Sequence, residues 1–187
     1  MVWDAGYTGF REDVVSDRES AAAALALLAG ALREATGHAR LSARGACMAP
    51  LVRDSDEVTV RPLDGAPPIG ALVLARGEGD ELLCHRVLVR TASGAVLGAD
   101  RTSATQAVPL DQLLGVIAAV HRRGRVLHLE GRLARGADYA LAALHRRRLL
   151  LVASTGMAPR ALGRCLGILH RLLLEVRRLA WVAARRQ

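Results

Sequence analysis

The chain has 187 residues, which is typical of one domain or of one domain with helical additions, and its 51% hydrophobic content is enough for a buried core. All 26 basic residues are Arg and the formal net charge is +8, which favours an acidic peptide, an anionic membrane or nucleic acid as a partner. Three widely spaced cysteines, Cys47, Cys84 and Cys165, exclude a disulfide framework and a zinc motif and fit a reducing compartment.

The N-terminal part predicts a short arm followed by one helix. Residues 1–15 carry no clear pattern, and no charged region followed by an apolar core marks a secretory signal. The apolar run 21–31 is well below the ~20 residues of a membrane-spanning helix. Residues 16–19 form a capping box with Ser16 at the cap, so we expect a helix to follow, ending at about Thr36. These features predict a cytoplasmic protein.

From Arg40 the pattern changes to short apolar segments separated by turns that contain Gly or Pro. No helical pattern lies between these segments, which favours an antiparallel, partly closed sheet over a parallel one. The polar stretch 99–108 is expected to be a loop. The strands are expected at 41–44, 57–62, 70–76, 82–90, 94–98, 113–120 and 124–129.

The C-terminal part is again helical in pattern. We expect one helix over 137–154, a break near Gly156, and a second helix over 159–184. We interpret the two as a hairpin packed on the sheet with a solvated Arg face. Two alternatives are a surface for a membrane and a surface for an acidic partner, and the Arg bias can also reflect a GC-rich genome. The expected buried face of the second helix comprises Leu162, Leu166, Leu169, Leu173, Val176 and Ala180.

The segment Arg44–Pro50 places a cysteine in a turn of small residues. Gly45 and Ala46 leave space beside Cys47, and Pro50 disfavours a helix for the residue before it. Such a turn suits the presentation of a nucleophile to an extended peptide. The alternative is a buried structural thiol, because free Cys is among the most buried residue types.

Gly45, Met48 and Pro50, followed by an acidic-Val strand, resemble the Gly-x-Ser-Met-x-Pro nucleophile box of signal peptidase I-like peptidases. That superfamily also contains the LexA-type self-cleaving repressors. Cys47 stands where the family has its nucleophilic Ser. The segment 83–88, Leu-Cys-His-Arg-Val-Leu, resembles the His-Arg-Val strand of the branch that uses a Ser–His pair.

Two further segments extend the resemblance to roughly residues 43–130. Residues 69–75 resemble the family's Gly-Asp-apolar strand, with Ala71 in place of the Asp. Residues 97–100 and 108–117 resemble its Gly-Asp segment and its closing Leu-Gly-x-Val strand. The order of the four motifs is that of the family.

The resemblance implies a mainly β (α+β) fold. We expect a signal-peptidase-like antiparallel, partly closed β core, flanked by an N-terminal helix and a C-terminal helical hairpin. The chain would divide into an N-terminal arm and helix (1–40), a catalytic β domain (41–131) and a basic amphipathic helical extension (132–187).

The expected chemistry follows from the absence of Lys, which excludes the Ser–Lys pair used by bacterial signal peptidases. His85 matches the catalytic His of the Ser–His branch and would activate Cys47. A thiol gives up its proton to imidazole more easily than a hydroxyl does, so a Cys–His pair needs less help from a third residue, a carboxylate that orients the His. Asp100 is the candidate to orient His85, with a turn residue as the alternative. The backbone N–H of Cys47 would stabilise the oxyanion.

The remaining histidines and cysteines match no family motif. Neighbours on a strand point to opposite faces, so if His85 faces Cys47, Cys84 faces away into the core. Cys165 is also expected in the core. The other histidines are expected at the surface or in packing roles: His38, His121, His128, His145 and His170.

Taken together, these patterns predict a soluble cysteine peptidase that uses a Cys47–His85 dyad to cleave a specific peptide or protein precursor, with no cofactor and no metal. One alternative is an inactive member that binds a peptide in the same groove. Another is a basic adaptor that binds an anionic membrane or nucleic acid through its C-terminal helix. In the peptidase, nucleic acid is not an expected partner, and the residues expected to contact the substrate are Gly45, Ala46, Met48 and Pro50.

Overall fold

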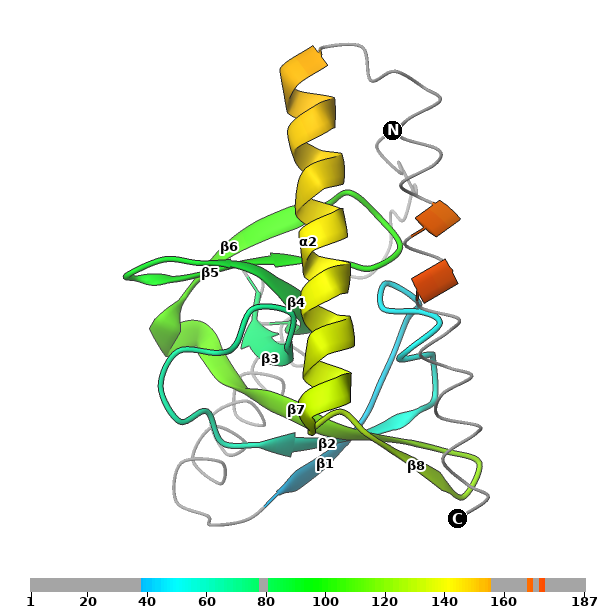
Figure 1. The fold of residues 1–187 in the computed structure, drawn as a ribbon. Helices are drawn as coiled ribbons and strands as arrows, with labels where there is room; N and C mark the ends of the chain where they lie inside the picture. The colour runs from blue at the N-terminus through cyan, green and yellow to red at the C-terminus, as the bar shows by residue number, and fades with distance from the viewer. Residues whose placement is uncertain (1–37, 78–80, 156–167, 170–171, 174–187) are drawn as a thin grey trace, which may run out of the picture.

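The computed structural model describes residues 38–77, 81–155, 168–169 and 172–173, and Figure 1 shows how their elements are arranged. Short strands precede one long helix along the chain. The strands are β1 (Ala39–Ser42), β2 (Glu57–Arg61), β3 (Leu72–Arg76), β4 (Leu82–Arg90), β5 (Gly94–Gly98), β6 (Thr105–Pro109), β7 (Leu113–Arg122) and β8 (Arg125–His128). A 3-10 turn, η1 (Leu110–Gln112), precedes β7, and the helix is α2 (Arg132–Thr155).

The strands form an eight-stranded sheet in the order β1-β2-β7-β3-β4-β5-β6, with β8 paired to β7. Every pair is antiparallel. The terminal strands β1 and β6 do not pair with each other within the described residues, so the sheet is not closed. The predicted mainly β, antiparallel core is therefore confirmed.

The sheet buries apolar side chains on both faces of β3. Leu72 and Leu74 belong to a first core cluster, whereas Val73 and Ala75 belong to a second one. Alternate residues of a strand point to opposite faces, which explains why β3 is a continuous apolar run. The first cluster also contains Met48, Leu51, Val52, Val58, Val60, Ile117, Val120 and Leu129. The second also contains Val87, Ala95, Leu97, Val108, Leu113 and Val116.

Helix α2 packs against β4 through one face and extends past the β5–β6 end of the sheet (Figure 1). Its buried residues, Asp138, Leu141, Ala142 and His145, recur at three or four, as expected for one face of a helix. Gly70 permits the close approach of the β2–β3 loop, because a Cβ there would lie 2.5 Å from the backbone of Asp138. Its φ of +91° also favours glycine.

Most predicted strands are confirmed, and the main correction concerns 99–108. Residues 105–109 form β6 rather than a loop, and among the described strands β6 pairs with β5 alone. Only Val108 of this strand is buried, so its sequence lacks the apolar alternation that marks the other strands. Helix α2 begins at Arg132, five residues before its predicted start.

The other helical predictions fall mainly on parts of the chain outside the described residues, namely the helix that ends at about Thr36 and most of 159–184. One part of the C-terminal prediction is wrong: Leu169, expected in the buried face, is 45% exposed, and its neighbour Ile168 is 57% exposed. Among the described helices, none has the length and apolar character needed to cross a bilayer.

Candidate active site

Cys47 lies in the loop 43–56 that joins β1 to β2, and hydrogen bonds close the base of this loop. The backbone N–H of Ala43 donates to the carbonyl of Asp56 at 2.7 Å, and that of Ser55 donates to Ala43 at 2.9 Å. Gly45 adopts a φ of +88°, and its N–H donates to Asp54 Oδ1 at 2.9 Å. The small residue at position 45 is therefore needed for the backbone turn itself.

A second set of contacts ties the same loop to strand β7. Arg122 Nη2 donates to the carbonyls of Pro50 at 3.3 Å and Leu51 at 3.0 Å. The same guanidinium forms a two-point contact with the buried carboxylate of Asp56, with 2.7 Å between Nε and Oδ1. Asp56 Oδ2 also accepts the N–H of Arg53 at 2.8 Å. The sequence motifs did not point to Arg122 or Asp56, because they pair across 66 residues.

A third contact joins Cys47 to the segment after β5. The backbone N–H of Arg101 donates to the carbonyl of Cys47 at 3.0 Å. Asp100, the expected third member of the site, immediately precedes Arg101 in the chain. The loop that carries the candidate nucleophile is thus attached to β7 on one side and to the Asp100 segment on the other.

The thiol of Cys47 is half-buried, and burial raises its pKa. The backbone N–H groups of Cys47 and Met48 lower this pKa, and the charge of Asp100 raises it further. The net shift is upward, so the thiol is neutral at neutral pH. Both N–H groups nevertheless favour negative charge on the sulfur of Cys47.

His85 lies on β4 opposite Val73 and is partly buried. Burial lowers the pKa of its imidazole, while the charge of Asp100 opposes that shift. Its Nδ1 is buried and has no hydrogen-bond partner in the described ranges. Within the described part of the chain, no hydrogen bond joins His85 to Cys47. A neutral imidazole with an unbonded nitrogen is in the protonation state that a general base requires.

Asp100 is held by Arg86 rather than by His85. Its two carboxylate oxygens accept from Arg86 Nε at 2.8 Å and Nη2 at 2.6 Å, and both side chains are 0% exposed. Arg86 Nη1 also donates to Asp138 at 2.6 Å and to the carbonyl of Gly70 at 2.8 Å. Since His85 Nδ1 has no partner among the described residues, it does not donate an orienting hydrogen bond to Asp100, and Asp100 acts on His85 through its charge.

Cys84 lies on the same face of the sheet as the first core cluster. It pairs with Leu74 and packs against the cluster that Cys47 also contacts. The pKa of the Cys84 thiol is raised to about 12, mainly by burial and to a smaller extent by the negative charges of the nearby Cys47 and Asp100. The expectation that Cys84 belongs to the core is confirmed, but Cys84 packs against the cluster that Cys47 contacts, so it does not face away from Cys47. Because neighbours on a strand point to opposite faces, the side chain of His85 points to the other face of β4, the face of Val73. A thiol with so high a pKa is a poor nucleophile.

The residues expected to contact the substrate divide into two groups. Gly45 and Ala46 are exposed, and no atom lies within 4 Å of a Cβ placed on Gly45. Pro50 is half-buried and follows a cis peptide bond. Met48 is only 2% exposed, so its side chain is buried rather than open to a substrate. Its apolar side chain fills the first core cluster beneath the loop.

The expected surface or packing roles of the other histidines fit those that are described. His145 is buried in α2, where its ring packs near Gly98, and His121 hydrogen-bonds Thr59 Oγ1 at 2.6 Å. His38 and His128 are exposed. In the same described ranges, no cluster of His, Cys, Asp or Glu side chains has the number needed to hold a metal ion.

Comparisons with known proteins add no family to this geometry. No protein-family model matches the sequence. A search of curated proteins also finds no match.

Proposed function

We propose that the protein is a cysteine peptidase in which Cys47 attacks a peptide bond of a specific peptide or protein precursor and His85 acts as the base. One observation carries this proposal. The carbonyl of Cys47 accepts the N–H of Arg101, next to Asp100, and the charge of Asp100 acts on the pKa of both Cys47 and His85. The thiol of Cys47 and the imidazole of His85 therefore have the carboxylate of Asp100 as a common neighbour.

The strand register brings the backbone of His85 close to the segment that contacts Cys47, although the side chain of His85 points to the face opposite that of Cys84. Arg86 pairs with Gly98 at the end of the β4–β5 ladder. Continuing that antiparallel register by one residue brings His85 beside Ala99. Residues 99–101 would thus lie between the backbone of β4 at His85 and the loop that carries Cys47.

The proposed reaction begins with a neutral thiol and a neutral imidazole. His85 takes the proton of Cys47 as sulfur bonds to the substrate carbonyl carbon, and the carbonyl electron pair moves to oxygen. The N–H groups of Cys47 and Met48 stabilise that oxyanion. His85 then protonates the leaving amine as the C–N bond breaks, leaving a thioester on Cys47. Water, deprotonated by His85, hydrolyses the thioester and restores the thiol.

Strand β1 provides a route for an extended substrate. It pairs with β2 on one side and has no strand partner on the other among the described residues. An extended peptide can add to such an open edge through main-chain hydrogen bonds. The exposed Gly45 and Ala46 lie in the loop that follows β1 and leave space for the substrate near Cys47.

The test is labelling with a set of peptide chloromethyl ketones, followed by mass spectrometry of the proteolytic fragments. We expect covalent addition to Cys47 that depends on the peptide sequence, with Cys84 and Cys165 unmodified. Cys47→Ala is the control and should take up no label. Labelling that is independent of the peptide, or that occurs mainly at Cys84, would contradict the proposal.

A second candidate is a peptide-binding protein that does not cleave. The absence of a hydrogen bond between His85 and Cys47 favours it, as does the commitment of both Asp100 oxygens to Arg86. Catalytic hydrogen bonds often form only with substrate bound, so the open His85–Cys47 arrangement is also compatible with the peptidase. Peptide binding that survives Cys47→Ala, with no cleaved product from the unaltered protein, would identify the second candidate.

A further inference from the structure

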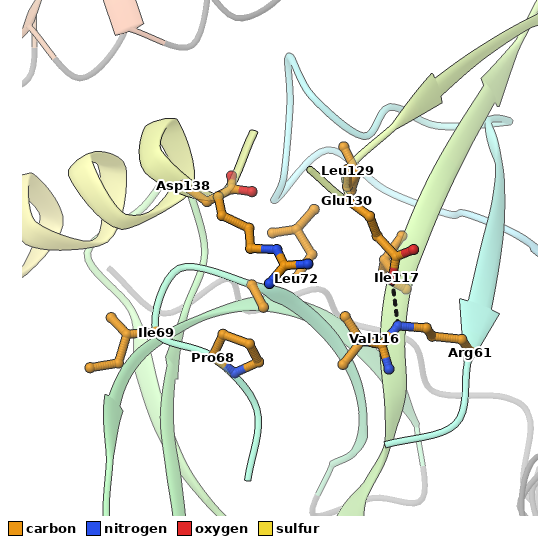
Figure 2. Close-up of a pocket in the computed structure, with 11 residues that line it drawn as sticks. Arg61, Pro68, Ile69, Leu72, Val116, Ile117, Leu129, Glu130 and Asp138 are labelled. Atoms are coloured by element: carbon orange, nitrogen blue, oxygen red, sulfur yellow. Dashed lines mark hydrogen bonds and ion pairs between the residues drawn. The ribbon is translucent and has the colours of Figure 1, made fainter. Parts of the chain in front are cut away.

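A cavity of about 80 Å³ lies between the sheet and the first turns of α2, and the proposed peptidase does not use it. Figure 2 shows its surroundings, with Leu72 and Val116 from the sheet on one side and Asp138 from α2 on another. Residues from five parts of the chain line it: the end of β2, the β2–β3 loop, β3, β7 and the segment from Leu129 into α2.

The floor of the cavity is apolar. It is formed by Pro68, Ile69, Ala71, Leu72, Val116, Ile117 and Leu129. An apolar cavity of roughly 150 Å³ can hold a benzene ring, so the smaller volume here suits a short, branched aliphatic group. Ligand sites commonly combine such an apolar floor with a few polar groups that fix the orientation of the ligand.

The two acidic groups that line the cavity are already neutralised. Glu130 forms an ion pair with Arg61, which Figure 2 shows as a dashed line. Asp138 accepts a hydrogen bond from the buried Arg86 at 2.6 Å. Neither carboxylate is therefore available to neutralise a further cation.

Arg135 is the remaining charged residue in the lining. Its guanidinium has no hydrogen bond or ion pair with any residue that the structure describes. On the sheet side, Ala71 contributes only a methyl group. The cavity thus combines an apolar floor with the guanidinium of Arg135, which has no carboxylate partner among the residues that the structure describes.

We propose that this cavity binds a short, branched aliphatic carboxylate, with the alkyl group on the apolar floor and the carboxylate paired to Arg135. Arg suits this role because its guanidinium matches a carboxylate in a two-point contact. A free fatty acid and the carboxyl terminus of a peptide ending in Leu have the same chemistry. The binding does not depend on peptide cleavage.

The test is a titration with 4-methylpentanoate, followed by NMR chemical shifts of the protein. We expect shifts at residues of the floor and α2, and none with the neutral 4-methylpentanamide. Arg135→Ala should weaken binding by about tenfold or more, because a hydrogen bond to a charged group is lost. Arg132→Ala is the control, since Arg132 is exposed on the same helix and does not line the cavity.

A second pair of variants separates charge from shape. Ala71→Asp places a carboxylate in the lining, so it should prevent binding of the acid, whereas Ala71→Asn has nearly the same shape and should retain most of it. A peptide ending in Leu with a free carboxyl group, compared with its amide, identifies the source. Equal binding of the acid and the amide would overturn the proposal, and so would unchanged affinity in Arg135→Ala or shifts confined to surface Arg residues.

Discussion

Both carboxylate oxygens of Asp100 accept hydrogen bonds from Arg86, and neither side chain is exposed to solvent. This pair joins the segment that contacts Cys47 to strand β4, and Arg86 extends the connection to Asp138 of α2. Asp100 is therefore part of the structural support of the candidate site before any role in catalysis is considered.

Asp100→Asn should reduce the free energy of unfolding by about 3 kcal/mol, the lower end for breaking a buried pair, because Asp138 still neutralises Arg86. Denaturant unfolding measures this directly. Asp111→Asn, in the exposed η1 turn, should change stability little and serves as the control. A stable Asp100→Asn protein that has lost activity would instead indicate that Asp100 acts on His85.

Arg122→Met should destabilise the protein by about 3–5 kcal/mol, because Asp56 is then left buried without its partner. Amide hydrogen exchange of residues 47–53 should accelerate, since Arg122 also holds the carbonyls of Pro50 and Leu51. The exposed Arg125→Met in β8 is the control. Unchanged exchange in the loop of the Arg122 variant would show that the guanidinium does not restrain it.

Two glycines should respond to Ala in opposite directions. Gly70→Ala should cost about 2 kcal/mol or more, because φ is positive and a Cβ would collide with the α2 backbone. Gly136→Ala, inside α2 with no atom within 4 Å of its Cβ position, should stabilise by about 0.5–1 kcal/mol. Thermal unfolding of both variants measures the contrast, and equal effects would contradict the described packing of α2.

Alkaline pH should weaken the fold through Cys84. Its thiol ionises at about 12 in the folded protein, against an ordinary value of 9.0. Between these values the unfolded state has lost more protons than the folded state, so stability falls as pH rises above 9.0. Stability curves measured from pH 8 upward should show a shallower fall in Cys84→Ala than in the unaltered protein. Parallel curves would show that Cys84 ionises normally.

The apolar pattern of the sequence predicted most strands, because alternation and turn residues are local signals. Strand β6 was not predicted because only Val108 of it is buried, so its sequence does not alternate between apolar and polar residues. Its backbone hydrogen bonds with β5 stabilise it as a strand. Helix α2 was predicted but its early start was not, because Arg132 and Arg135 are exposed polar residues and add nothing to the apolar periodicity from which a helix is predicted.

The candidate site was only partly predictable from the sequence. The turn around Cys47 follows from small residues and Pro50, and its exposed Gly45 fits that expectation. The contacts of Arg122 with Asp56 and of Arg86 with Asp138 depend on strand register and on the placement of α2. Met48 belongs to a local sequence motif, but the motif does not tell which way its side chain points, and the side chain is buried in the core.

The most direct test of the Cys47–His85 pair is the rate at which a peptide chloromethyl ketone modifies Cys47 at neutral pH. We predict that His85→Ala slows this reaction by about 10²-fold or more, because the thiol loses its base. In the unaltered protein this reaction should also slow as pH falls through the lowered pKa of His85. The same pH dependence should be absent in His85→Ala. His128→Ala, an exposed histidine on β8, should react at the original rate. Equal rates for His85→Ala and the unaltered protein would contradict the account.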